Sequence, residues 1–196
     1  GLTSDVGSGV SFVNGHPAKV INMSFGSFGS CPPQYSELIA ELNAVGVTVV
    51  VAAGNDNGLA VNVPANCPGA VGVAGIRHVG SKVGYSNVGP EIAIAAPAGN
   101  CVNLVGTCLF PLLTTINLGL TAPTTNTFSD SSNATLGTSF SAPLVAGTVG
   151  LMLSVNPTLT PAQVKLVLQS SARVFPSSGG EAAATACRAP NGVGQF

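Results

Sequence analysis

The segment Val47–Ala52 constrains the fold most, because it reads Val-Thr-Val-Val-Val-Ala and is apolar or β-branched throughout. A strand without a polar side is typical of a parallel sheet that is covered on both faces. Shorter strand patterns lie at Ala18–Met23, Ala70–Ile76 and Ile92–Ala95. The sequence therefore predicts a sheet whose strands are largely parallel and buried.

Helical patterns alternate with these strands. One is expected from Pro32 to Gly46, where apolar residues recur at helical spacing: Tyr35, Leu38, Ile39, Leu42 and Val45. A longer one, Thr138–Val155, is apolar almost all round, which predicts a buried helix. A third begins at Thr160, where Gln163 completes a capping box. This alternation indicates an α/β fold with a doubly wound, mostly parallel sheet and helices on both faces.

The 196 residues suit one sizeable domain. Charged residues make up only 7% of the chain, and hydrophobic residues 45%. The longest apolar stretch, Leu144–Val155, is interrupted by glycine, serine and threonine, which argues against a membrane-spanning helix. A net charge of −1 without clustered basic residues argues against nucleic-acid binding. A compact secreted protein fits best, and no signal peptide opens the sequence, so we expect that any such segment has been removed.

The five cysteines support the same compartment. None forms a C-x-x-C pair, and the two histidines, His16 and His78, are not spaced as zinc ligands, so we expect no metal site. Disulfides in an oxidising compartment are then the favoured use, with buried unpaired thiols as the alternative. The odd count leaves at least one cysteine free or paired outside the chain.

Two short motifs carry the chemistry. Gly137–Pro143 reads Gly-Thr-Ser-Phe-Ser-Ala-Pro and places Ser139 in the first turn of a helix, where unpaired N–H groups favour an oxyanion. The alternative is that Thr138 or Ser139 only caps the helix. The second motif, Ala-Ala-Gly-Asn, ends the strand Val47–Ala52 at Asn55, on the sheet edge where ligands bind. Its alternative is an ordinary asparagine turn.

Together these motifs resemble the subtilisin-like serine proteases, the subtilases, and in particular their bacterial extracellular branch. Val20–Gly26 resembles the family's substrate-binding strand, and Tyr85–Pro97 resembles a segment common in the family. The similarity covers residues 17–172. It implies one partial catalytic domain over 1–196, with a loop after a cut at 1–16, a core at 17–172 and a tail at 173–196. It also implies an extracellular protein.

The resemblance implies a serine endopeptidase that forms an acyl-enzyme on Ser139. Asn55 would donate its amide to the oxyanion together with the Ser139 N–H. The residues implied to bind substrate are Ser24, Phe25 and Gly26, which would pair with its backbone, and Ala52, Ala53 and Gly54, which would line the P1 pocket. The chemistry would need no cofactor. Structural calcium is compatible with Asp56, Asn57 and Asp130, although three scattered oxygen donors favour solvated loops.

A base and its orienting carboxylate are missing from this pattern. The family's aspartate and histidine motifs precede the substrate-binding strand and do not occur here. The candidates in this chain match neither motif: His16, His78, Asp5, Asp56 and Asp130. We therefore expect a separate or removed upstream polypeptide to supply the aspartate and histidine. The sheet would then be incomplete on its N-terminal side, and this chain alone would be inactive.

Disulfides are predicted for Cys31–Cys67, which flank neighbouring strands, and for Cys101–Cys108, which are close in one predicted loop. Cys187 would remain for the missing portion.

Rival functions come from other classes. A pseudoenzyme or binding module would keep the cleft without needing both Ser139 and Asn55. An esterase of the α/β-hydrolase type needs Gly-x-Ser-x-Gly, but Ser141 stands two residues after Ser139. A nucleotide-binding enzyme would carry Gly-x-Gly-x-x-Gly after its first strand, and no such run occurs.

Overall fold

The computed structural model describes residues 18–100, 110–130 and 136–176. Its main sheet contains four parallel strands that lie side by side in chain order. These strands are β1 (Val20–Met23), β2 (Thr48–Ala52), β3 (Val71–Ile76) and β4 (Ile92–Pro97). All four expected strands are therefore present, and their parallel pairing confirms the α/β prediction.

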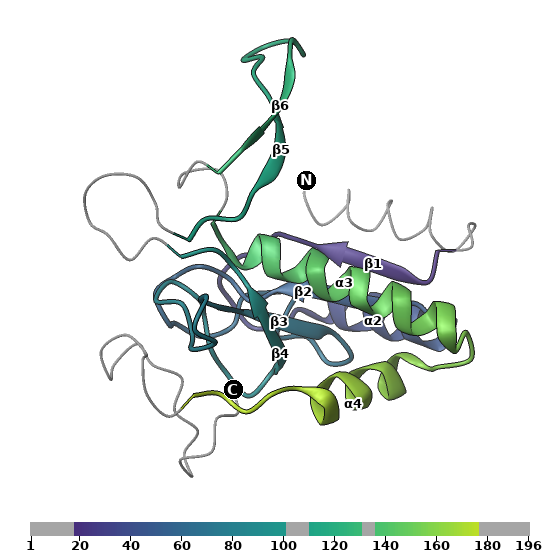
Figure 1. Ribbon diagram of the computed structural model, residues 1–196. Helices are drawn as coiled ribbons and strands as arrows, with labels where there is room; N and C mark the ends of the chain where they lie inside the picture. The colour runs from purple at the N-terminus through teal and green to yellow at the C-terminus, as the bar shows by residue number, and fades with distance from the viewer. Residues whose placement is uncertain (1–17, 101–109, 131–135, 177–196) are drawn as a thin grey trace.

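Helices cover both faces of this sheet (Figure 1). Helix α2 (Pro33–Ala44) packs on one face, and α3 (Thr138–Val155) and α4 (Pro161–Ser171) pack on the other. Strand β2 shows why both faces must be covered, because Val49 and Val51 join the α2 cluster while Val50 joins the α3 cluster. Each fully buried valine stabilises the fold by about 1.5–3 kcal/mol.

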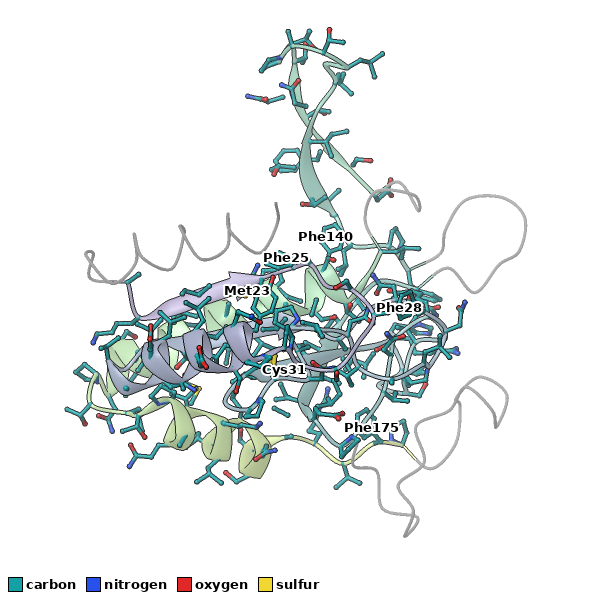
Figure 2. The ribbon with its side chains drawn as sticks, turned by 180° about the vertical axis from the view of Figure 1, so that it is seen from behind. Met23, Phe25, Phe28, Cys31, Phe140 and Phe175 are labelled. Carbon is teal, nitrogen blue, oxygen red and sulfur yellow. A yellow bond between two sulfur atoms is a disulfide. The ribbon has the colours of Figure 1, made fainter. Side chains whose placement is uncertain are left out.

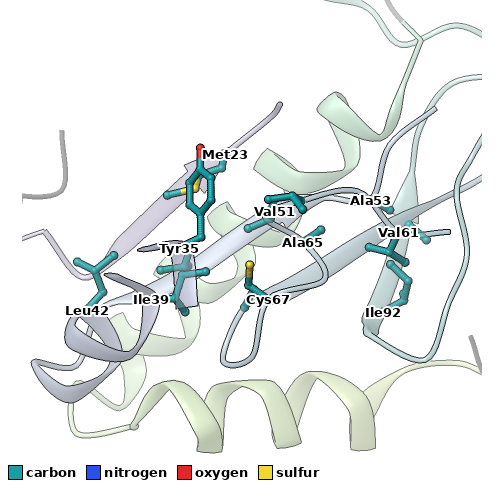
Figure 3. Packing of buried hydrophobic residues seen from close by; sticks show 14 of the residues in the cluster. Met23, Tyr35, Ile39, Leu42, Val51, Ala53, Val61, Ala65, Cys67 and Ile92 are labelled. Carbon is teal, nitrogen blue, oxygen red and sulfur yellow. The ribbon is translucent and has the colours of Figure 1, made fainter. Parts of the chain in front are cut away.

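Helix α2 follows its predicted pattern. Tyr35, Ile39 and Leu42 point into the core (Figure 3). The helix ends with Gly46 at φ +81°, and the N–H of Val47 donates to the Leu42 carbonyl, as in a Schellman motif. Val45 is exposed and does not join the apolar face that its spacing predicted, because it is the C-cap and no longer follows the helix.

A disulfide joins Cys31, just before α2, to Cys67, just before β3. The S–S distance is 2.01 Å and the Cα atoms are 5.1 Å apart, so this predicted pair is confirmed. Cys67 is buried in the same cluster as Ile39 and Leu42. The predicted pair Cys101–Cys108 and the expected role of Cys187 lie outside the described residues.

Helix α3 has the predicted bounds, but the prediction that it is buried all round is wrong. Its inner face packs on the sheet through Ala142, Val145, Val149 and Leu153. Its outer face leaves Leu144, Leu151 and Val155 exposed at 48%, 70% and 88%. An apolar composition cannot itself bury a helix, and the sheet covers only one side. By length and hydropathy α3 would also pass as a membrane span, a test that core helices pass as well.

Two further elements complete the described chain. Helix α4 begins with the predicted capping box between Thr160 and Gln163. Strands β5 (Thr114–Asn117) and β6 (Asn126–Ser129) form an antiparallel hairpin that projects from the body of the molecule (Figure 1). The hairpin lies in a part of the chain that is rich in threonine and asparagine and has no strong helical or strand period in its sequence.

Candidate active site

The end of β2 meets the start of α3 through Asn55 and Thr138. The Thr138 N–H donates to Asn55 Oδ1 at 2.9 Å, and the Thr138 hydroxyl lies 3.0 Å from the same oxygen. The Gly54 N–H donates to that hydroxyl at 3.2 Å. These bonds fix the asparagine amide through its oxygen, which leaves the Nδ2 donor directed elsewhere.

Gly137, the N-cap of α3, shows where this donor lies. Its φ of +135° is a conformation that L side chains rarely adopt. A Cβ built on Gly137 would lie 3.3 Å from Asn55 Nδ2 and 3.7 Å from the Ser139 nitrogen. The Ser139 N–H belongs to the first turn of α3 and has no acceptor within the helix. Two donors thus border one small space beside Gly137, which we call the donor space.

The hydroxyl of Ser139 faces the end of β1. It donates to the Ser24 carbonyl at 3.1 Å, and the Ser24 hydroxyl donates back to the Ser139 carbonyl at 2.8 Å. Asn22 Nδ2 in turn donates to the Ser24 hydroxyl at 2.9 Å. Figure 2 shows the neighbouring residues Phe25, after β1, and Phe140, in α3. The segment after β1 and the first turn of α3 are therefore bound to each other.

No histidine or carboxylate among the described residues accepts the proton of the Ser139 hydroxyl. The His78 ring stacks on Phe110 with centroids 3.5 Å apart. Asp56 Oδ2 accepts bonds from Asn62 and Asn87, and Asp130 is exposed after β6. The other two candidates, His16 and Asp5, lie outside the described residues.

The residues expected to pair with substrate follow β1 directly. Ser24, Phe25 and Gly26 belong to no strand, and Phe25 and Gly26 are exposed. A Cβ on Gly26 would lie 2.9 Å from the Val63 carbonyl oxygen, so only glycine fits there without movement. The structure thus brings this segment to Ser139, through Ser24.

The residues expected at the P1 wall differ in how deeply they are buried. Ala52 and Ala53 are buried in the two core clusters, whereas Gly54 is partly exposed. Gly54 has φ +108°, and a Cβ there would lie 2.5 Å from the amide nitrogens of both Asn62 and Asn87. Glycine is therefore required at the turn that carries Asn55.

The sequence did not reveal the partners that hold this turn. The sequence indicates only a possible helix cap at Thr138, and it places Asn87 only within the segment Tyr85–Pro97. A buried strand followed by Gly-Asn needs polar partners for its exposed main chain, which is the signal that could have found them. Asn62 and Asn87 occupy the Asp56 carboxylate. The described residues contain no cluster of three or more potential ligands among histidine, cysteine, aspartate and glutamate, and calcium binding stays a prediction.

Comparison with known proteins identifies the family. The Subtilase family profile matches residues 1–194. An extracellular protease of Xanthomonas campestris pv. campestris is 40% identical over 171 residues, which cover 85% of this chain and 27% of that protein.

Two solved structures are similar as well. A protease of Pseudoalteromonas arctica has a TM-score of 0.74 and 38% identity, over 82% of this chain and 46% of that one. A cold-adapted subtilisin-like serine proteinase has a TM-score of 0.64 and 29% identity, over 87% of this chain and 55% of that one. This chain thus spans between about a quarter and about half of these relatives' length. Its sequence and its fold agree, and the chain belongs to the subtilase family.

Proposed function

We propose that this chain is the serine-bearing part of a secreted serine endopeptidase. Ser139 is the nucleophile that forms the acyl-enzyme, and the oxyanion binds to Asn55 Nδ2 and the Ser139 N–H. The observation that carries the proposal is the donor space, which both donors border at 3.3 and 3.7 Å from a single point. A tetrahedral intermediate places its negative oxygen in such a space. A helix that only needed a cap would not require a second, side-chain donor there.

The main-chain geometry favours the charge that develops on attack. The positive end of the α3 dipole lies at Ser139, so a negative oxygen is stabilised where the helix begins. Asn55 cannot turn its amide oxygen toward the intermediate, because Thr138 occupies that oxygen. The donors are therefore oriented before substrate arrives, and no reorganisation is needed during the reaction.

The proton of Ser139 needs an acceptor that the described residues do not offer. A backbone carbonyl such as that of Ser24 accepts the hydrogen bond but is far too weak a base to remove the proton. The histidine and the aspartate come, on this proposal, from an upstream polypeptide of the same protease. This polypeptide is either a second chain or a region preceding the present sequence.

The outer face of α3 supports this partner. Leu144, Leu151 and Val155 are exposed there, no charged residue lies in the whole helix, and Cβ atoms on Gly147 and Gly150 would meet open space. Strand β1, on which α3 packs, is an edge strand whose outer side pairs with no described strand. An apolar helix face beside an open strand edge is a surface that proteins normally cover. Ser139 opens the same helix, so a polypeptide docked there would lie close to the hydroxyl.

Substrate recognition follows the same arrangement. Ser24, Phe25 and Gly26 would add the substrate as an extended strand, a mode that reads main chain more than sequence. The turn at Ala52–Gly54 would form the P1 wall, with Gly54 as its exposed member. The curated relative from Xanthomonas is an extracellular protease, which supports secretion of the present protein.

Labelling with a fluorophosphonate tests the missing base. The isolated 196-residue chain should react more slowly than the complete protease by about 10²–10⁴-fold, the usual contribution of a general base. Ser139→Ala should abolish labelling of the complete protease and serves as the control for site specificity. Equal rates for the isolated chain and the complete protease would show that the base lies within this sequence.

A paired substitution tests the docking surface. Leu151→Asp on the outer face of α3 should prevent the upstream polypeptide from restoring activity when it is added or co-expressed. Leu166→Asp on α4, where the side chain is 63% exposed, is the matched control and should leave restoration intact. If the upstream polypeptide restored activity to the Leu151→Asp variant as well as to the Leu166→Asp variant, the partner would dock elsewhere.

Asn55→Ala in the complete protease tests the donor space. Turnover should fall by about 10²–10³-fold with little change in KM, a magnitude measured for a subtilisin and hence for this family. A boronic-acid inhibitor that mimics the tetrahedral intermediate should lose affinity in parallel. An unchanged kcat would refute the assignment of Asn55.

A further inference from the structure

We infer that the segment Lys82–Asn87, here called the brace, positions both oxyanion donors, and that Asn87 is its principal positioning residue. The inference rests on the proposed function, since it takes Asn55 and the Ser139 N–H as those donors. The brace contacts Asp56, the residue after Asn55, and it also contacts Gly137, the residue before Thr138. Neither contact involves the reacting atoms, so the brace acts through the two turns.

Asn87 holds the turn of Asn55. It is fully buried, and its Oδ1 accepts the Asp56 N–H at 2.8 Å. Its Nδ2 donates to Asp56 Oδ2 at 2.8 Å and to the Ala60 carbonyl at 3.1 Å. Its own N–H donates to the Gly54 carbonyl at 3.0 Å. Main-chain groups on both sides of Asn55 are thus bonded to this one residue.

The carboxylate of Asp56 makes the hydrogen bond from Asn87 charge-assisted. Its Oδ2 accepts from Asn62 Nδ2 at 2.9 Å as well as from Asn87. A carboxylate acceptor makes these bonds stronger than bonds between neutral groups. The amide of Asn55 therefore sits on a turn whose next residue has both its N–H and its side chain fixed.

Tyr85 holds the other donor's turn. Its hydroxyl accepts the Gly137 N–H at 3.0 Å, and the same oxygen lies within bonding distance of the Ala98 and Gly99 carbonyls. Gly137 has the φ of +135° that aims the first turn of α3. The Gly137 N–H also donates to the Ala98 carbonyl at 2.9 Å, so the hydroxyl and this carbonyl together support the bend that borders the donor space.

Lys82 and Ser86 make the brace rigid. The Lys82 side chain is buried, and its ammonium donates to the carbonyls of Val83, Gly84 and Ser86 at 2.9, 2.9 and 3.1 Å. A buried charge needs such partners, so the carbonyls are drawn around it. The Ser86 hydroxyl accepts the Gly75 N–H at 2.9 Å and fastens the brace to β3. The two contacts at Tyr85 and Asn87 are therefore parts of one cross-linked segment.

A double-mutant cycle in the complete protease tests Asn87. Asn87→Ser should lower kcat by about 10–10²-fold with little change in KM, since small displacements of a positioned group cost this much. In an Asn55→Ala background the same substitution should cost about 2-fold or less, because the donor that it positions is gone. Asn43→Ser, which removes an amide bonded to the Gly69 carbonyl, is the matched control and should change neither background.

The outcomes separate this inference from the proposed function. If Asn55→Ala leaves kcat unchanged, the proposed function fails before the brace is tested. If Asn55→Ala is damaging but Asn87→Ser has the same cost in both backgrounds, Asn87 acts independently of Asn55 and the inference is overturned.

Two further measurements test the inference if the Asn87→Ser variant does not fold. Tyr85→Phe removes only the hydroxyl and should lower kcat several-fold in both backgrounds, because it acts on the Ser139 donor. No change in kcat would overturn this end of the brace. In the 196-residue chain, NMR should show Asn55 side-chain amide signals at chemical shifts that differ from those of an unrestrained asparagine. Averaged signals for that amide in the unsubstituted chain would show that it is not held in place.

Discussion

The helices on the two faces of the sheet differ in how fully the described residues cover them. On one face α2 is amphipathic, with Tyr35, Ile39 and Leu42 buried and a disulfide at the entrance of the helix. On the other face α3 is apolar on both sides, and its outer residues Leu151 and Val155 stay exposed. The first helix has a solvent side and the second has none. The amphipathic pattern thus belongs to a helix with a solvent side, and the all-apolar pattern belongs to a helix whose outer face the described residues leave uncovered.

The active site divides along the same line. The proposed oxyanion donors lie where the end of β2 meets the start of α3, and Thr138 bonds the amide oxygen of Asn55 there. The Ser139 hydroxyl has only the Ser24 carbonyl as its acceptor in the described structure. On the proposed function, the described residues supply the donors that stabilise negative charge, and none of them supplies the base that moves the proton.

Cavity substitutions should give the largest contrast between the two faces. Ile39→Ala, in the fully buried core of the α2 face, should lower the free energy of unfolding of the chain by about 2–5 kcal/mol. Leu151→Ala on the outer face of α3 should change it by about 0.5 kcal/mol or less. Urea unfolding measures both. A similar cost at the two positions would mean that the outer face is already covered in the isolated chain.

Loss of the disulfide should follow in size. The Cys31→Ala/Cys67→Ala double variant should lose about 2–4 kcal/mol of stability, since the bond closes a loop with a sequence separation of 36. Urea unfolding of the variant, with the reduced wild type as control, gives the value. If loss of the disulfide increased amide exchange in α3 alone, this result would contradict the placement of the disulfide beside α2.

The smallest expected effect is on the pH dependence of the free energy of unfolding, through a lysine on the α3 face of the sheet. Burial lowers the pKa of Lys165 below its ordinary value of 10.5, while its ammonium donates to the Ala70 carbonyl. The unfolded chain therefore binds more protons than the folded chain between the lowered pKa and 10.5, and stability should rise with pH across that window. Lys165→Met should reduce this slope, and Lys19→Met, at an exposed lysine, should not. An identical slope in all three proteins would show that Lys165 is not desolvated.

Much of this architecture follows from local patterns. The β-branched run Val47–Ala52 is typical of a strand covered on both faces, and the capping box of Thr160 and Gln163 predicts the start of its helix. The burial of α3 could not be predicted in this way. Its apolar pattern is correct for the surface it must bury, but the pattern does not say whether this chain carries the covering element.

The site shows the same limit. Asn55 and Ser139 could be named as candidates from their motifs, and Asn55 Nδ2 and the Ser139 nitrogen border the same space in the structure. Asn87 and Tyr85 could not be assigned a position, because their contacts with Asp56 and Gly137 depend on how loops from distant parts of the chain meet. Hydrogen bonds between such loops have no period and no fixed spacing in the sequence.

The reciprocal bonds between Ser24 and Ser139 carry a kinetic consequence. A peptide that draws the segment after β1 into a strand also acts on the first turn of α3, because each serine donates to the other's carbonyl. If Ser139 is the proposed nucleophile, binding energy from substrate residues distant from the scissile bond would act at the nucleophile rather than only in affinity. The proposed function then makes substrate length a determinant of kcat, and short substrates would understate what the catalyst can do.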